Sequence, residues 1–221
     1  MMTNLFSTFD PASTMKLSTN WISSLWCFII MPLPYWITPN RISILMNKII
    51  MYMYNELKTL MGNNSMGMKL MMLSLFMMIM LNNTMGLLPY VFTSSSHLTF
   101  TLALALPMWL SLMLFGWINK MNQMFSHMIP SGTPSMLMPF MVIIETISNM
   151  IRPGSLAVRL TANMIAGHLL MSLLGNNLTM TWTMPLLLLI QMMLMMFEMA
   201  VAMIQAYVFS VLSTLYSSEV I

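Results

Sequence analysis

Residues 155–170 read SLAVRLTANMIAGHLL, and Arg159 stands in the middle of this otherwise apolar stretch. Arginine stays charged at any accessible pH, so a copy inside a membrane cannot escape the desolvation penalty by losing its proton. On insertion scales that penalty is roughly 2.5–3.5 kcal/mol at the centre of the bilayer, and such a residue normally faces a partner or a water-filled cavity. If the stretch lies in a membrane, Arg159 is the first candidate for a functional residue.

The composition around this stretch indicates an integral membrane protein. Of the 221 residues, 58% are hydrophobic and 6% are charged, whereas soluble domains carry about 25% charged residues. The mean hydropathy is +0.80. The apolar runs are long, as membrane-spanning helices require and barrel strands do not. We therefore expect an all-α integral membrane protein.

The charged and sulfur-containing residues exclude several other classes. The eight basic residues are spread over the chain without forming a patch, which argues against nucleic-acid binding and fits membrane topology. Cys27 is the single cysteine, and the 35 methionines do not cluster with His or Cys, so we expect no disulfide, metal or cofactor. The methionine excess is typical of codon bias in organelle genomes. Because no nucleophile triad or nucleotide loop occurs, we expect no catalytic site of its own.

We expect a single membrane domain with four successive parts. They are a first span at 20–37, an amphipathic helix on the membrane surface at 41–61, a helical hairpin at 68–118 and a long tilted hairpin at 136–216. In 41–61, apolar residues recur every three or four positions among charged ones, which is typical of an amphipathic helix. The segments of the last hairpin exceed the roughly 20 residues that cross a bilayer. They are therefore strongly tilted or broken, and Pro153 with Gly154 allows a break.

The loop cations predict the orientation of the chain. Five crossings place five of the cations on one side, with the N-terminus outside and the C-terminus inside. These five are Arg41, Lys48, Lys58, Lys69 and Lys120.

Polar residues recur at helical intervals along both segments of the last hairpin. On the first, Glu145, Arg159 and Asn163 are separated by fourteen and four residues, which places them on one helix face. On the second, Glu198, Gln205 and Glu219 are separated by seven and fourteen residues and also share a face. Buried carboxylates take up and release protons, and arginine does not. The two stripes therefore predict a polar pathway between the helices.

Two residues keep alternative interpretations. His168 lies nine residues from Arg159, about half a turn away from the stripe. It either meets Glu198 where the helices cross or is a satisfied structural histidine, and spacing favours neither. Arg152 either snorkels or pairs with Glu145.

The two C-terminal segments together resemble a known family. The stretch quoted above, followed by FEMAVAMIQAYVFSVLSTLY at 197–216, is very similar to the C-terminal half of subunit a, or subunit 6, of mitochondrial F-type ATP synthases. The resemblance covers roughly the last 80 residues strongly and the rest through the layout of the spans. It implies the stationary half of a rotary proton turbine that lies against a ring of c subunits.

The resemblance also implies residue roles and partners. Arg159 would prevent protons from short-circuiting between two half-channels, with Asn163 and Gln205 as its polar neighbours. His168 and Glu198 would line the half-channel open to the intermembrane space. The half-channel open to the matrix would be lined by Glu145 and Glu219. The implied partners are the c-ring, the peripheral-stalk subunit b, small membrane subunits including subunit 8, and the lipid bilayer of the mitochondrial inner membrane, with an organelle gene as the source.

The residues alone leave two other functions open. A secondary transporter or a proton-translocating subunit of a respiratory complex would use Arg159 to bind an anion or pair with a carboxylate. Such transporters usually contain internal repeats, and the sequence shows none. A membrane anchor without a transport role would leave the two polar stripes unexplained.

Overall fold

Every regular element in the described part of the chain is a helix, which confirms the expected all-α class. The computed structural model describes residues 5–12, 17–32, 36–62, 66–129, 132–176, 182 and 184–220. Its longer helices are α2 (Arg41–Met61), α3 (Met66–Gly86), α4 (Leu98–Asn119), α6 (Met138–Asn176) and α7 (Met184–Val220). Shorter ones are the 3₁₀ helices η1 (Leu5–Phe9), η2 (Thr19–Leu25) and η3 (Ser94–Ser96), with α1 (Trp26–Ile30) and α5 (Met121–Met128).

Four of these helices, α3, α4, α6 and α7, are long and apolar enough to cross a membrane. Lipid offers no hydrogen-bond partners, and a helix satisfies its own backbone groups, so apolar helices are the form in which such sequences enter a bilayer. The chain is therefore a multi-pass membrane protein.

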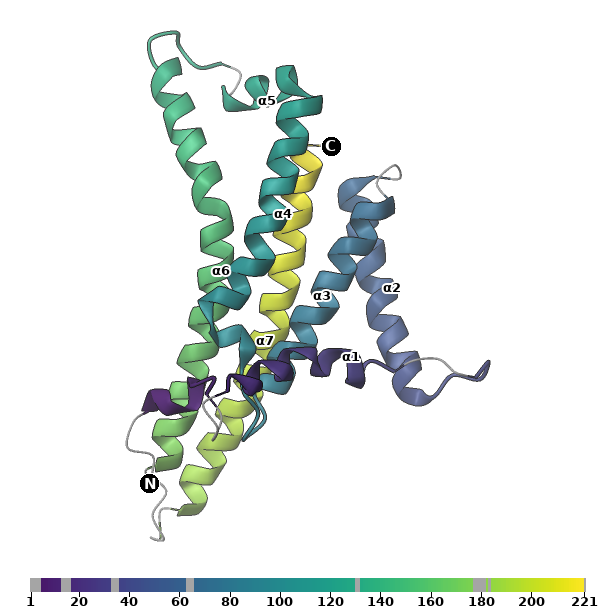
Figure 1. Cartoon of the computed structure of the whole chain (residues 1–221), viewed down its shortest axis with the longest axis vertical. Helices are drawn as coiled ribbons and strands as arrows, with labels where there is room; N and C mark the ends of the chain where they lie inside the picture. Colours follow the sequence, from purple (N-terminus) through teal and green to yellow (C-terminus); the bar gives the residue numbers. More distant parts are fainter. Residues whose placement is uncertain are drawn as a thin grey trace.

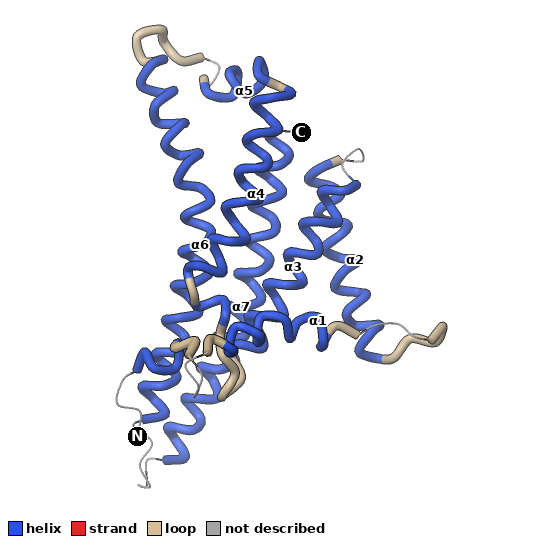
Figure 2. The backbone as a smooth tube through the Cα atoms, viewed as in Figure 1, coloured by secondary structure: helices blue, strands red, loops and turns tan. Residues whose placement is uncertain are grey.

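The long helices lie alongside one another, with α7 between α3 and α6 (Figure 1). Loops and short helices connect them at both ends of the bundle (Figure 2). The α6 and α7 helices contain 39 and 37 residues, about 58 and 55 Å, which is far more than the ~30 Å core of a bilayer. Strong tilt of this pair in the membrane remains our prediction. The break allowed for at Pro153 and Gly154 does not occur, because α6 continues through both residues.

Small residues bring the central helices together. Ala157 of α6 and Ala206 of α7 are both fully buried, in a cluster with Phe76 and Ile79 of α3 and Ala105 of α4. Membrane helices attract one another mainly through close van der Waals packing, and alanine permits a close approach of the backbones. This packing fixes which faces of α6 and α7 remain exposed.

The N-terminal part differs from the expected first span. A helix forms only over Thr19–Ile30, about 20 Å long, which is shorter than the hydrocarbon core. Met31 is extended, with ψ of 117°. It precedes Pro32, and the ring of a proline disfavours the helical conformation in the residue before it. The expected helix over 20–37 is therefore not formed as one element, and residues 33–35 lie outside the described part.

The α2 helix occupies the residues of the amphipathic segment. Its buried residues include Met53 and Leu57, and it packs against α3 and α7. Arg41 and Lys48 lie exposed on the same helix. A position of α2 on the membrane surface remains a prediction.

Candidate functional site

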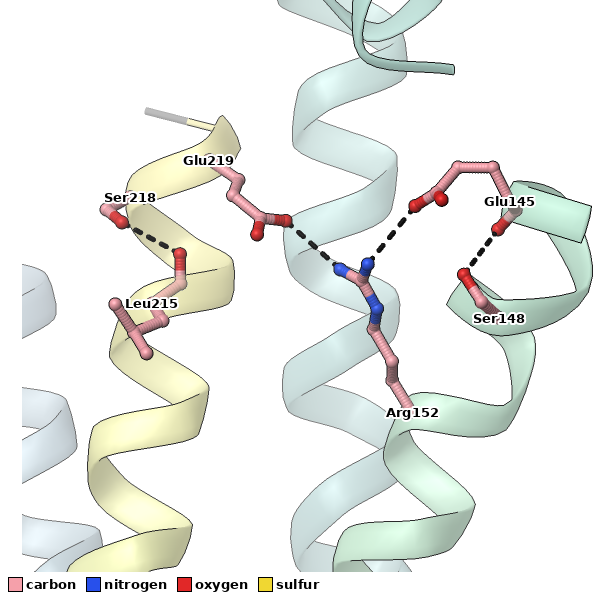
Figure 3. Close-up of polar contacts among 6 residues, drawn as sticks. All are labelled: Glu145, Ser148, Arg152, Leu215, Ser218 and Glu219. Atoms are coloured by element: carbon pink, nitrogen blue, oxygen red, sulfur yellow. Dashed lines mark hydrogen bonds and ion pairs between the residues drawn. The ribbon is translucent and has the colours of Figure 1, made fainter. Parts of the chain in front are cut away.

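Two candidate residues of the last two helices, Glu145 and Glu219, meet in an ion-pair cluster around Arg152 (Figure 3). The Arg152 Nη2 donates to Glu145 Oε1 at 3.1 Å, and its Nη1 donates to Glu219 Oε2 at 3.1 Å. The guanidinium carbon also lies 4.9 Å from the ring centre of Tyr216, a cation–π contact. One arginine therefore joins a carboxylate of α6 to a carboxylate of α7. We call these three ionised residues the Arg152 cluster.

Helix periodicity explains half of this cluster. Glu145 and Arg152 are seven residues apart, two turns along one face of α6. Glu219 lies 67 residues further on, in the last turn of α7. The side chains of Arg152, Glu145 and Glu219 are 25%, 36% and 55% exposed, so the cluster is open to its surroundings on one side.

A further carboxylate, that of Glu198, lies at the other end of the contact between α6 and α7. Glu198 is buried, and its carboxylate lies against the backbone of Gly167. A Cβ built on Gly167 would be 2.6 Å from Glu198 Cδ and 3.1 Å from its Oε1. Gly167 therefore provides the space that Glu198 occupies.

His168 follows Gly167 in α6 and is half-buried. Its Nε2 is buried and has no hydrogen-bond partner in the described part of the chain. Its ring meets the ring of Phe9 edge-on, with 6.0 Å between centroids. His168 also has a hydrogen bond to the backbone of Gly86. One polar atom of its ring is therefore without a partner, which is unfavourable when buried, and both interpretations of His168 remain predictions. No hydrogen bond or ion pair joins His168 to Glu198 in the described part of the chain, so a contact between these two side chains stays a prediction. Gly167, its neighbour His168 and Glu198 are called the Glu198 cluster below.

Arg159 lies between these two clusters on α6. It is exposed, and it forms no ion pair or hydrogen bond with another described residue. Three exposed residues near it along the helix, Ser155, Ala162 and Ala166, are small, and the adjacent exposed residue Val158 is apolar. The guanidinium therefore stands on an otherwise uncharged surface with room for another helix to approach.

The separation along the helix axes is large. Arg159 is seven residues from Arg152 and eight from Gly167, about 10 Å and 12 Å along α6. Glu198 and Glu219 are 21 residues apart on α7, about 31 Å. The pair Glu145 and Glu219 thus lies at one level and the single carboxylate Glu198 at another, with the permanently charged Arg159 between those levels.

The structure brings some of the predicted residues together and separates others. Glu145 and Glu219, which the resemblance assigned to the same half-channel, converge on Arg152. Asn163 and Gln205 are half-buried, and the structure shows no hydrogen bond from either side chain to Arg159. Arg152 is the residue whose importance the sequence did not reveal. The seven-residue spacing between Glu145 and Arg152 was the sequence signal for their pairing. No pattern in the sequence indicated that Arg152 also contacts α7.

Further buried polar groups lie near the Glu198 cluster. Gly86, at the end of α3, packs against Thr93, whose Cγ2 would be 2.9 Å from an added Cβ, and against Met164 of α6. One turn earlier, Asn83 is fully buried, and neither polar atom of its side chain has a partner in the described part of the chain. Among the described residues, no group of three His, Cys, Asp or Glu side chains is placed to hold a metal ion.

Comparison with known proteins shows the family of this chain. The chain matches the family described as ATP synthase A chain over residues 4–218. It is 60% identical to the ATP synthase subunit a of Locusta migratoria, over 100% of both chains. It is also 58% identical to that of Anopheles quadrimaculatus and 57% identical to that of Drosophila melanogaster, again over 100% of both chains. This chain therefore belongs to the ATP synthase A chain family.

Proposed function

We propose that this chain is the stationary proton-translocating subunit in the membrane sector of an ATP synthase. Its membership in the family supports a role in proton transport coupled to ATP synthesis. The observation that carries the finer proposal is the position of Arg159, which is exposed and unpaired among the described residues and lies between the carboxylate pair of the Arg152 cluster and the single carboxylate of Glu198. The family assignment decides against the secondary-transporter and membrane-anchor alternatives.

Arg159 separates two proton half-channels in this proposal. A fixed positive charge repels protons and hydronium ions, so it blocks a direct path between carboxylates at different levels. The same charge attracts an ionised carboxylate on a rotating partner and leaves a protonated one free to move away. Moving one charge through 100 mV yields about 2.3 kcal/mol, and a leak past Arg159 would dissipate that energy.

The Glu198 cluster forms the uptake half-channel, open to the intermembrane space. Glu198 is buried against Gly167, and the unpartnered Nε2 of His168 is available to exchange a proton or bind water. Asn163 and Gln205 provide the polar surroundings of Arg159. The uptake path thus ends close to the residue that blocks its continuation.

The Arg152 cluster forms the release half-channel, open to the matrix. Glu145 and Glu219 are both partly exposed, so protons delivered to them pass readily to water. A partner carboxylate that has rotated past Arg159 would ionise at this level. The two half-channels are then offset along the long helices, as one-way rotation requires.

The partner at the Arg159 surface is a ring of c subunits, each carrying a carboxylate. Apolar residues such as Ile151 and Val158 are 59% and 51% exposed on α6, and the small residues beside Arg159 allow close approach of a neighbouring helix. Subunit b of the peripheral stalk and small subunits including subunit 8 are the further proposed partners. The proposed location is the mitochondrial inner membrane.

Replacement of Arg159 tests the proposal. In reconstituted ATP synthase, Arg159→Ala is expected to abolish ATP synthesis driven by a proton gradient, because protons pass between the half-channels without turning the ring. Arg41→Ala, on the exposed surface of α2, is the matched control and is expected to retain synthesis. Full coupled synthesis by the Arg159→Ala enzyme would contradict the proposal.

A further inference from the structure

We propose that Arg152 is a positioning residue that ties α6 to α7 at the release path and holds Glu145 and Glu219 at one point. The inference rests on the proposed function, because it assigns a role to a residue of the same pathway. Its geometric basis is one guanidinium that donates at 3.1 Å to a carboxylate on each of two helices.

The chemistry of arginine suits this position. Its planar guanidinium presents several N–H donors in a fixed fork, so two separate carboxylates bind in defined directions. Here Nη1 donates a hydrogen bond to Glu219, and Nη2 donates one to Glu145. A lysine has one compact ammonium group on a flexible stem and does not reproduce this forked geometry. The contact is therefore specific to arginine rather than to positive charge alone.

Tyr216 restricts the guanidinium further. Its ring lies 4.9 Å from the guanidinium carbon, and it stands three residues, about one turn, before Glu219 on α7. Arg152 thus contacts α7 at two successive turns. A guanidinium held at both places has a defined position against α7, which a single exposed ion pair does not provide.

The charges of the cluster also bear on proton release. Two carboxylates close together repel each other, and the guanidinium between them offsets that repulsion. With two acidic side chains and one basic side chain, the cluster still offers a carboxylate to a proton arriving from the partner. Without Arg152, the two carboxylates would move apart, and the release path would lose its fixed end.

The test compares variants of the reconstituted enzyme per assembled complex, with assembly measured on native gels. Arg152→Gln is expected to lower proton conduction at least about tenfold, because Glu145 and Glu219 would leave their positions in the release path. Arg152→Lys is expected to restore part of this loss, since it keeps the charge and loses the fork. Arg41→Gln removes an exposed arginine of α2 and serves as the control.

A double-mutant cycle separates positioning from a general structural role. Because Arg152 and Glu219 act together, Arg152→Gln and Glu219→Gln combined are expected to reduce conduction no more than the stronger single change. Unchanged conduction per complex in Arg152→Gln, with or without reduced assembly, would overturn the inference. A double variant whose loss of conduction equals the product of the two single losses would overturn it as well.

The failure of this inference is distinguishable from failure of the proposed function. Loss of coupled synthesis in Arg159→Ala together with normal conduction in Arg152→Gln would overturn the role of Arg152 alone. Full coupled synthesis in Arg159→Ala would overturn the half-channel proposal, whatever Arg152→Gln shows.

Discussion

At the residue scale, Gly167 shows how a missing side chain shapes the candidate site. The carboxylate of Glu198 occupies the space that any Cβ at position 167 would need. By contrast, Gly154 lies in the same helix and would place its Cβ in open space, with no atom within 4 Å. The two glycines therefore have different physical roles despite their similar settings in α6.

The substitution Gly167→Ala is expected to reduce proton conduction, because the new methyl group pushes the Glu198 carboxylate out of its position. Gly154→Ala is the matched control, with no steric conflict and a gain of about 1 kcal/mol in helix propensity. Proton flux through the reconstituted membrane sector measures both variants. Equal flux in both would show that the position of Glu198 is unimportant.

The carboxylate of Glu198 can be tested without changing its shape. Glu198→Gln replaces a group that exchanges protons with an amide that does not. We expect proton uptake to fall by about 100-fold or more, within the range of positioned acid–base groups, while His168 and the assembly of the complex stay intact. Loss of assembly, seen on native gels, would indicate a structural role for Glu198 instead.

At the scale of the element, α2 is held to the bundle by a small number of buried side chains. Leu57 is fully buried and clusters with Met72 of α3 and Met108 of α4. Leu45, on the same helix, is 58% exposed. One leucine therefore fixes α2 to its neighbours, while the other faces the surroundings.

Leu57→Ala is expected to destabilise the docking of α2 by about 2–5 kcal/mol, through lost contacts and the cavity left behind. Leu45→Ala makes the same chemical change at an exposed position and is expected to change stability by less than about 0.5 kcal/mol. Thermal denaturation of the purified complex compares the two. Equal effects would mean that α2 is not docked as described.

At the scale of the whole molecule, the exposed face of α6 determines where a partner can lie. Val158 is 51% exposed beside Arg159, whereas Leu156 is 8% exposed and packs into the bundle. The two positions are two residues apart and point to different sides of the helix. Only the first is accessible to the ring of c subunits that we propose as the partner.

Cysteine cross-linking tests this placement. In a Cys27→Ser background, which removes the single native cysteine, Val158→Cys is expected to cross-link to a cysteine placed near the carboxylate of a ring subunit. Leu156→Cys is the control and is expected to form no such product. Cross-linking at 156 rather than 158 would place the ring on another face.

The sequence predicted features that depend on local order along the chain. Hydrophobic runs predicted the all-α class, because composition alone decides whether a helix is stable in lipid. Helical spacing raised the pairing of Arg152 with Glu145 as one of two alternatives, since residues seven apart share a face of one helix. The resemblance at 155–170 pointed to the family that the comparisons confirm. In the first span expected at 20–37, the sequence did not predict that a 3₁₀ helix, Thr19–Leu25, precedes the short α-helix Trp26–Ile30.

By itself, then, the sequence determined the membrane class, the family and the polar residues of each long helix. Tertiary structure alone decided that Arg152 reaches Glu219, that Glu198 lies against Gly167, and that Arg159 forms no pair among the described residues. Helix periodicity orders side chains within one helix. The rotation and offset of one helix against another arise from close packing of residues such as Ala157 and Ala206, and no local pattern in the chain specifies that fit.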